Sequence, residues 1–251
     1  VLLFTDITRQ RETDARLSRI AHFDALTGLP NRDLLLIRLQ AALDAHRQAR
    51  QLGAAIMLDL DNFRAVNENA GWGHGDELLR EVALRLGALM RPGDTLARLG
   101  GDEFVLVLER LTGVDEAERF VQAVQACLRP PIKLGQDERA YTQASLGLIR
   151  FEDAEGEAEL LLRKLEVALF EAKRGGGNTW RRFAPAMGEQ ARQRMQLEQR
   201  LRLALQEQQS SRWSRSPAAG WSAWRHWCVS TSPACRRWGR TSSSRFSNRP
   251  G

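Results

Sequence analysis

Hydrophobic and polar positions change between helical and strand-like spacing along most of the chain. Apolar residues recur every three or four positions in residues 31–50, 75–90, 114–128 and 157–173, which predicts helices. Nearly continuous apolar runs at residues 54–60, 95–108 and 140–150 predict strands, and a Gly-Gly pair splits the second run into a hairpin. The pattern therefore predicts the order α-β-α-β-β-α-β-α, an α+β sheet domain of about 160 residues with helices packed on it.

The segments on either side of this domain differ from it. In residues 1–25 a short apolar piece precedes a charged stretch in which Leu17 and Ile20 share one helical face. This narrow stripe predicts a connector helix that either pairs with a copy of itself or packs on its own domain. Residues 184–208 predict a second charged helix. Residues 209–251 contain five of the seven tryptophans but no acid and no periodicity, so we expect no folded domain there.

The net charge of +6 suggests a nucleic-acid ligand until its position is considered. Eight of the 37 basic residues follow Glu207, whereas none of the 31 acidic residues does, which leaves 29 basic and 31 acidic residues in the rest of the chain. A phosphate-tracking groove needs positive charge on the folded body, so we expect no nucleic-acid partner. A basic aromatic tail that binds nucleic acid is the alternative.

Other classes are excluded by the sequence pattern. No apolar run approaches the roughly 20 residues that cross a bilayer, and the first residues do not resemble a secretion signal. The three cysteines have unrelated spacings, which argues against a disulfide framework or a zinc site. We therefore expect a cytoplasmic protein without a membrane segment in this chain.

The strongest local signal lies at the hairpin turn. Gly100 and Gly101 allow a tight turn and a close approach to a ligand, and Asp102 and Glu103 follow directly. Adjacent acids at one turn repel each other unless a cation neutralises them. The alternative is an ordinary hairpin whose acids are solvated.

A second acidic pair, Asp59 and Asp61, ends the first predicted strand. Acids at the exit of a buried strand, beside a hairpin with two more, can build an oxygen-only site for Mg²⁺. Two such ions suit phosphoryl or nucleotidyl transfer. The alternative is a strand that simply emerges into solvent.

Several motifs in order resemble the GGDEF family of diguanylate cyclases, over roughly residues 22–183. The landmarks are Asp24-Ala-Leu-Thr-Gly-Leu-Pro-Asn-Arg32, Asp59-Leu-Asp61 with Phe63, Asn67, Gly75-Asp76, Arg98-Leu-Gly-Gly-Asp-Glu-Phe104, Ser145-Leu-Gly147, and Ala172-Lys173 near Asn178. The resemblance implies a palm-like fold similar to that of nucleotide cyclases, with a central, mostly antiparallel five-stranded sheet flanked by helices.

The resemblance also implies residue roles. The expected ligands of two Mg²⁺ or Mn²⁺ ions per active site are the carboxylates of Asp59 and Asp102 and the backbone carbonyl of Leu60. The expected GTP contacts are Asn67 and Asp76 at the guanine edge, Gly100 and Gly101 at the α-phosphate, Lys173 at the terminal phosphates, and Phe63. Glu103 is expected to assist loss of the proton from the attacking 3′-hydroxyl. The implied reaction joins two GTP molecules into cyclic di-GMP in a homodimer, since each domain binds one GTP.

An R-x-x-D motif, Arg91 to Asp94, stands five residues ahead of the hairpin motif. In the family this position is the product-inhibition site, where cyclic di-GMP binds. The alternative is a helix end followed by a Pro-Gly turn.

Six positions depart from the family pattern. Arg64 stands where Lys is usual, Glu68 where Asp is usual, Trp72 where His is usual, Leu165-Glu166 where Ala-Asp is usual, and Gly177 where Arg is usual. Trp72, Gly177 and a linker of the EAL type favour an alternative function, a catalytically weak GTP-binding regulatory module of a cyclic di-GMP phosphodiesterase, whereas the intact motif Gly100–Phe104 favours the cyclase. A receptor that binds cyclic di-GMP through Arg91 and Asp94 alone is a third hypothesis.

The flanks resemble neighbouring domains of such proteins. Residues 1–23 resemble the end of a PAS sensor with its connector helix, residues 24–183 the GGDEF domain, and residues 184–208 a linker toward an EAL phosphodiesterase domain. Residues 209–251 then replace the expected EAL sequence. GC-rich codons for Gly220–Val229, read one nucleotide out of register, can spell the start of an EAL domain. This predicts that the tail is a frameshift product. Resequencing of the gene around the codons for residues 208–211 tests this prediction.

Overall fold

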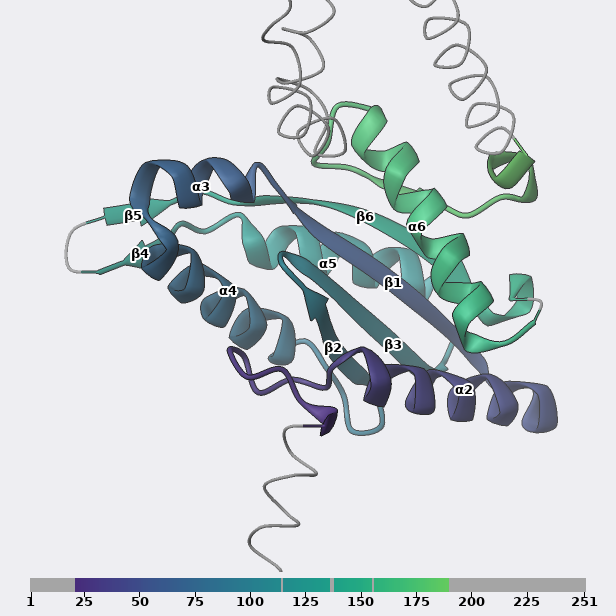
Figure 1. Cartoon of the computed structure of the whole chain (residues 1–251). Helices are drawn as coiled ribbons and strands as arrows, with labels where there is room; N and C mark the ends of the chain where they lie inside the picture. Colours follow the sequence, from purple (N-terminus) through teal and green to yellow (C-terminus); the bar gives the residue numbers. More distant parts are fainter. Residues whose placement is uncertain (1–20, 114, 136–137, 155, 190–251) are drawn as a thin grey trace, which may run out of the picture. The chain divides into compact units, whose positions relative to one another are not determined.

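A five-stranded sheet organises the protein (Figure 1). The computed structural model describes residues 21–113, 115–135, 138–154 and 156–189. The strand order is β2-β3-β1-β6-β7, and every neighbouring pair is antiparallel except β6 and β7. The strands are β1 (Leu52–Asp61), β2 (Thr95–Gly100), β3 (Glu103–Leu111), β6 (Gln143–Arg150) and β7 (Trp180–Arg182). The expected mostly antiparallel α+β fold is confirmed.

The central strand β1 is buried from Gly53 to Leu60 because helices cover both faces of the sheet. Ile56 and Leu58 belong to one core cluster together with residues of α4 (Trp72–Gly87) and α5 (Glu116–Leu128). Met57 belongs to a second cluster with residues of α2 (Arg32–Ala49) and α6 (Ala158–Arg174). A strand buried on both faces reads as a continuous apolar run, which explains the sequence of β1.

The predicted helices and the predicted hairpin form close to their expected positions. Asn31 caps α2 as expected, because its side chain accepts a hydrogen bond from the Leu34 N–H at 3.1 Å. The helix predicted from Gly75 begins three residues earlier, at Trp72. The sequence pattern did not predict the short elements: α3 (Phe63–Ala70), β4 (Ile132–Leu134), β5 (Glu138–Ala140), the 3₁₀ turn η1 (Phe151–Asp153) and β7.

The flanking segments fall largely outside this description. The connector helix expected within residues 1–23 and the tail expected over 209–251 lie outside the described residues, as does most of the linker expected over 184–208. Across the portion that is described, no helix combines the length and apolar character needed to cross a membrane.

Strand register brings distant acids to one edge of the sheet. Asp59 on β1 lies opposite Glu103, the first residue of β3, and opposite Ser145 on β6. The turn between β2 and β3 therefore stands beside the end of β1. The helix pair α3 and α4 follows directly from that end.

Candidate functional site

Three carboxylates gather where β1 ends and the β2–β3 hairpin turns. Burial raises the pKa of Asp59, and Asp61 adds to this shift while Lys173 opposes it. Burial, followed by the charge of Asp59, raises the pKa of Asp102. Burial and the charges of Asp59 and Asp102 also raise the pKa of Glu103. The three acids are thus close enough to repel one another, and this edge has an excess of negative charge that a cation would relieve.

Glycine is required at the turn by the backbone. Gly100 has φ of 144° and Gly101 has φ of 53°, and both values lie in the region that side chains disfavour. A Cβ atom built at either position would meet no heavy atom within 4 Å, so the space above the turn is open. The turn therefore presents bare backbone toward open space, as close approach of a phosphate requires.

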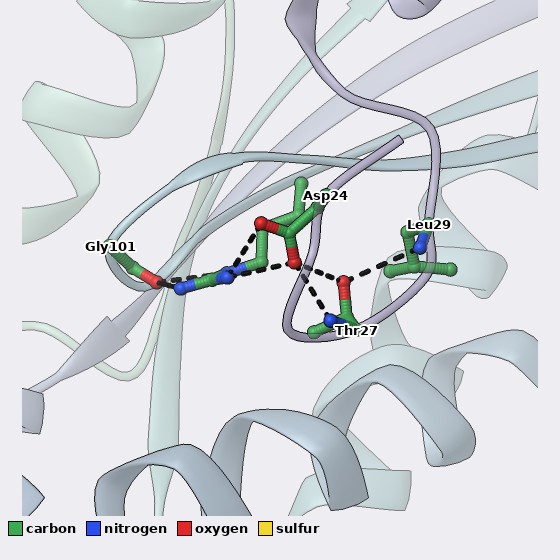
Figure 2. A network of polar contacts seen from close by, with 5 residues as sticks. Asp24, Thr27, Leu29 and Gly101 are labelled. Carbon is green, nitrogen blue, oxygen red and sulfur yellow. Dashed lines mark hydrogen bonds and ion pairs between the residues drawn. The ribbon is translucent and has the colours of Figure 1, made fainter. Parts of the chain in front are cut away.

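A buried arginine fixes this turn to the start of the domain. Arg98 donates to both oxygens of Asp24 at 2.8 and 2.9 Å, and to the carbonyl of Gly101 at 2.6 and 3.1 Å. Figure 2 shows Asp24 between Gly101 on one side and Thr27 on the other, and Thr27 donates two hydrogen bonds to the carboxylate of Asp24. Burial opposes ionisation, yet hydrogen bonds from Thr27 and Arg98 hold the pKa of Asp24 below its ordinary value. The motif that begins at Asp24 is thus tied directly to the backbone of the hairpin turn.

Lys173, near the C-terminal end of α6, reaches the acidic edge. Its Nζ atom lies 2.6 Å from Oδ2 of Asp59, and its side chain is about half exposed. The ammonium group therefore neutralises part of the charge at this edge while remaining accessible to a ligand.

Asp61 serves a different purpose from Asp59, although the two belong to one motif. Its Oδ1 accepts from the hydroxyl of the fully buried Ser145 at 2.7 Å, and its Oδ2 accepts from the Asn178 N–H at 2.6 Å. Asp61 thus fastens the loop after α6 to the sheet. Gly177 in that loop has φ of 73°, and an added Cβ would lie 3.2 Å from the carboxylate of Asp61. The sequence pattern suggests Asp61 as part of an oxygen site for metal, whereas the structure shows it holding a loop.

Two adjoining cavities open beside the acidic edge. The first, of about 430 Å³, is lined by Phe63, Arg64, Asn67, Glu68, Trp72 and Asp102. The second, of about 500 Å³, is lined by Asp59, Leu60, Asp61, Asn62, Phe63, Arg64, Asp102, Gln143, Lys173, Gly176 and Gly177. They share Phe63, Arg64 and Asp102, so they form one continuous hollow. We call the first the base cavity, because it brings together two aromatic rings and an amide, and the second the phosphate cavity, because Lys173 and the backbone of Gly176 and Gly177 line it.

Asn67 in the base cavity carries a buried side-chain oxygen that has no hydrogen-bond partner. A buried polar atom without a partner costs about 1–3 kcal/mol, and a ligand donor would remove that cost. A Cβ atom at Gly75 would lie 1.9 Å from this oxygen, so only glycine leaves room for the amide. Asp76, the next residue on α4, lies beside this contact but does not line the cavity.

The residues present suit a divalent cation that arrives with a phosphate ligand. Within the part of the chain that the structure describes, no three His, Cys, Asp or Glu side chains form a group that could hold a metal ion by themselves. Mg²⁺ is often bound through one or two carboxylates, completed by substrate phosphates and water. The mutual repulsion of Asp59 and Asp102, beside the backbone of Leu60, fits that kind of site.

The motif from Arg91 to Asp94 lies at the far end of the hairpin and has its own partners. The guanidinium of Arg91 lies 2.6 Å from Glu116, and Asp94 accepts from the backbone N–H groups of Arg91 and Glu109 at 3.0 Å each. Glu116 also accepts from the N–H and hydroxyl of Thr112. Both motif residues thus help to hold the end of α4 to β3 and α5.

The structure brings most of the predicted site together. Asp59, Leu60, Phe63, Asn67, Asp102 and Lys173 line the continuous hollow, and Glu103 stands beside it through its pairing with Asp59. Arg91 and Asp94 lie apart, before β2 begins. Sequence reasoning missed the roles of Arg98 and Asp61. Both residues belong to sequence motifs, which could have marked them, but their partners are distant in the chain. Asp24 lies 74 residues from Arg98, and Asn178 lies 117 residues from Asp61.

Comparison with known proteins supports one family. The family model described as "Diguanylate cyclase, GGDEF domain" matches residues 21–179. The chain is 35% identical over 205 residues to the cyclic di-GMP phosphodiesterase PdeR of Escherichia coli, covering 82% of this chain and 30% of PdeR. It is 34% identical over 167 residues to the diguanylate cyclase TpbB of Pseudomonas aeruginosa, covering 66% of this chain and 38% of TpbB. The chain thus spans only about a third of the length of these relatives.

Solved structures agree with the sequence matches. The GGDEF domain of TpbB from Pseudomonas aeruginosa superposes with a TM-score of 0.66 at 30% identity, covering 68% of this chain and 99% of that chain. The coiled coil and GGDEF domain of DgcB from Caulobacter crescentus, in complex with c-di-GMP, superposes with a TM-score of 0.64 at 25% identity. That match covers 70% of this chain and 93% of the DgcB chain.

Proposed function

Because the chain belongs to the diguanylate cyclase GGDEF domain family, we propose that it condenses two GTP molecules into cyclic di-GMP with release of two pyrophosphates. The observation that carries this proposal is the continuous hollow in which the base cavity and the phosphate cavity meet at Asp102. One nucleoside triphosphate extended across both would place its α-phosphate beside the acidic edge and the open Gly100–Gly101 turn.

In this proposal the base cavity recognises guanine. The unpartnered oxygen of Asn67 accepts a hydrogen bond from the guanine edge, and Phe63 packs against the ring at the boundary between the cavities. Asp76 contributes once its side chain turns toward the base, since it neighbours the contact between Gly75 and Asn67. These contacts would explain a preference for guanine over other bases.

The phosphate cavity positions the reacting groups. Asp59, Asp102 and the carbonyl of Leu60 would hold two Mg²⁺ or Mn²⁺ ions, which when bound stabilise negative charge on the phosphate oxygens. Lys173 exchanges its contact with Asp59 for the terminal phosphates, as a mobile point charge can. Gly100 and Gly101 leave room for the α-phosphate.

Glu103 is the proposed general base. Burial and neighbouring acids raise its pKa, so it holds a proton more strongly than an ordinary glutamate does. The 3′-oxygen of one GTP attacks the α-phosphorus of the other, its proton passes to Glu103, and the bond to pyrophosphate breaks. Repetition with the roles exchanged closes the ring.

The chain offers one such hollow among its described residues, so two chains must face each other for the reaction. We propose a homodimer in which each 3′-hydroxyl reaches the partner's nucleotide, a proximity effect that a monomer lacks. Product inhibition would follow if cyclic di-GMP binds Arg91 and Asp94. The DgcB structure in complex with c-di-GMP supports c-di-GMP as a ligand of this family.

A second candidate function is a GTP-binding regulatory module of a cyclic di-GMP phosphodiesterase. It is favoured by the 35% identity to the phosphodiesterase PdeR and by Gly177, which stands where the family pattern has an arginine near the phosphates. In this alternative the hollow binds GTP but does not turn it over.

Incubation of the purified chain with GTP and Mg²⁺, followed by chromatographic separation of nucleotides, separates the two functions. Cyclic di-GMP that forms with the wild type and is absent with Glu103→Ala supports the cyclase. Saturable GTP binding without product at any protein concentration supports the regulatory module.

A further inference from the structure

Trp72 is an exposed tryptophan on the inward side of its helix. Its side chain is 80% exposed, although tryptophan is usually well buried. It lies seven residues, about two helical turns, before Leu79, which is buried in the core. Residues separated by seven positions share one face of a helix, so Trp72 is on the side of α4 that faces the domain. Trp72 also lines the base cavity, so its largely exposed ring stands at the edge of that cavity.

Three of the family departures, Arg64, Glu68 and Trp72, line this cavity. Arg64 and Glu68 form an ion pair at 2.7 Å across one turn of α3, with both side chains mostly exposed. Since that pair cancels its own charge, the ring of Trp72 is the large apolar surface that these departures add. The same cavity contains Phe63 and the unpartnered oxygen of Asn67, which suits a ligand that is flat, aromatic and edged with hydrogen-bond donors.

We propose that Trp72 stacks on the purine ring of the bound nucleotide and is an affinity-determining residue of the base cavity. This inference rests on the proposed function, because it takes a purine nucleoside triphosphate as the ligand. Base–aromatic stacking tolerates any purine, so Trp72 supplies affinity while Asn67 supplies the choice of guanine. A tryptophan gives a larger stacking surface than the histidine of the family pattern.

The test uses the full chain, Mg²⁺ and a GTP analogue with a methylene group between the α- and β-phosphorus atoms, which prevents turnover. Binding is measured by titration calorimetry for Trp72→Ala, Trp72→Phe and the wild type. Removal of the stacking ring predicts roughly 5- to 150-fold weaker binding in Trp72→Ala, the range expected for one base on one aromatic ring. Trp72→Phe should retain most of the affinity, since a ring remains.

Two controls separate stacking from a structural effect. Tripolyphosphate, which has no base, should bind Trp72→Ala as tightly as the wild type. Leu84→Ala removes another exposed apolar side chain from the same helix and should leave binding of the analogue unchanged. Binding should also quench tryptophan fluorescence in the wild type more than in Trp72→Phe.

The outcomes distinguish this inference from the proposed function. If the wild type binds the analogue and Trp72→Ala binds it equally well, the stacking role is wrong and the GTP site stands. Equal weakening for tripolyphosphate would also overturn stacking, because the effect would not depend on the base. If the wild type shows no saturable binding of the analogue, both the stacking role and the GTP-binding function are wrong.

Discussion

Acidic side chains cluster at both ends of the β2–β3 hairpin, but their pKa values are shifted in opposite directions. At the turn end, burial raises the pKa of Asp59, Asp102 and Glu103, and the charge of a neighbouring carboxylate adds to each shift. At the open end, hydrogen bonds from Thr112 and the charge of Arg91 lower the pKa of Glu116 to about 2. The acid at the open end is thus fully paired within the fold, whereas Lys173 neutralises only part of the negative charge at the turn end.

This difference indicates which acids serve ligands and which serve the fold. Buried carboxylates that repel one another lower the stability of the fold unless a ligand neutralises them, whereas the carboxylates at the open end already have hydrogen-bond and ion-pair partners. The proposed inhibitory site lies at the open end. Cyclic di-GMP that binds there would meet Arg91 with one guanidinium nitrogen already paired with Glu116, so inhibition would share or displace an existing ion pair.

The largest expected effect concerns the arginine that anchors the turn end. Arg98→Met leaves the carboxylate of Asp24 and the carbonyl of Gly101 without their shared donor. Breaking a buried ion pair by removing one partner costs about 3–5 kcal/mol, so the free energy of unfolding should fall by that amount. Denaturant titration measures it. A decrease below about 1 kcal/mol would show that the turn does not depend on Arg98.

The next prediction separates catalysis from stability at the turn end. Asp102→Asn removes a charge that Asp59 repels, so thermal stability at neutral pH should be unchanged or higher. Cyclic di-GMP formation should nevertheless fall about 100- to 1,000-fold, the usual effect of removing one group that stabilises developing charge. Thermal unfolding and product assays on the same sample check both. Decreased stability together with unchanged activity would reverse the assignment.

The matched change at the open end is Glu116→Gln. It should lower stability by about 1–3 kcal/mol, because the amide accepts poorly from Thr112 and no longer pairs with Arg91. Cyclase activity at low product concentration should remain. If the inhibitory proposal is right, the freed Arg91 should also bind cyclic di-GMP more tightly, which calorimetry with the product measures.

The pH dependence of these two variants should have opposite signs. Glu116 has a lowered pKa when folded, so it stabilises the protein above its ordinary pKa of 4.5 and loses this effect as the pH falls toward about 2. The stability deficit of Glu116→Gln should therefore shrink on acidification. Asp102 has a raised pKa when folded, so its charge destabilises the fold at neutral pH, and protonation relieves this on acidification. Any stability gain of Asp102→Asn should therefore vanish in acid. Unfolding free energies measured across this pH range test both signs.

The smallest expected effect concerns Gly177, in the loop after α6 that lines the phosphate cavity. Gly177→Ala places a Cβ at φ of 73° and 3.2 Å from the carboxylate of Asp61, which should cost about 1–2 kcal/mol. Since the loop adjoins Lys173, KM for GTP should rise more than kcat falls. Gly113→Ala has no positive φ and open space, and it should leave both stability and kinetics unchanged.

The sequence anticipated the elements whose pattern is local and long. β1 was predictable because both of its faces are buried, and α4 because Leu79 and Leu86 recur on one side. α3 was missed because it is eight residues long and buries no residue completely. β7 was missed because its three residues become a strand only by pairing with β6 after the α6 crossover.

The site was predictable only in its residue types. The motifs indicated Asp59, Asp102 and Lys173, but their mutual contacts depend on strand register and on the end of α6. The clamp formed by Asp61 and the pairing of Arg91 with Glu116 join residues far apart in the chain. The place of Trp72 at the edge of a cavity could not be inferred either, because Trp72 lay outside the helix that the sequence predicted from Gly75.

The proposed cyclase activity is tested most directly by cyclic di-GMP formation from GTP and Mg²⁺ as a function of protein concentration, with Glu103→Ala and Glu116→Gln as paired variants. We expect product whose rate per chain rises steeply with concentration, disappears in Glu103→Ala and persists in Glu116→Gln. Turnover that is undiminished in Glu103→Ala, or no product from the wild type at any concentration, would contradict the proposal.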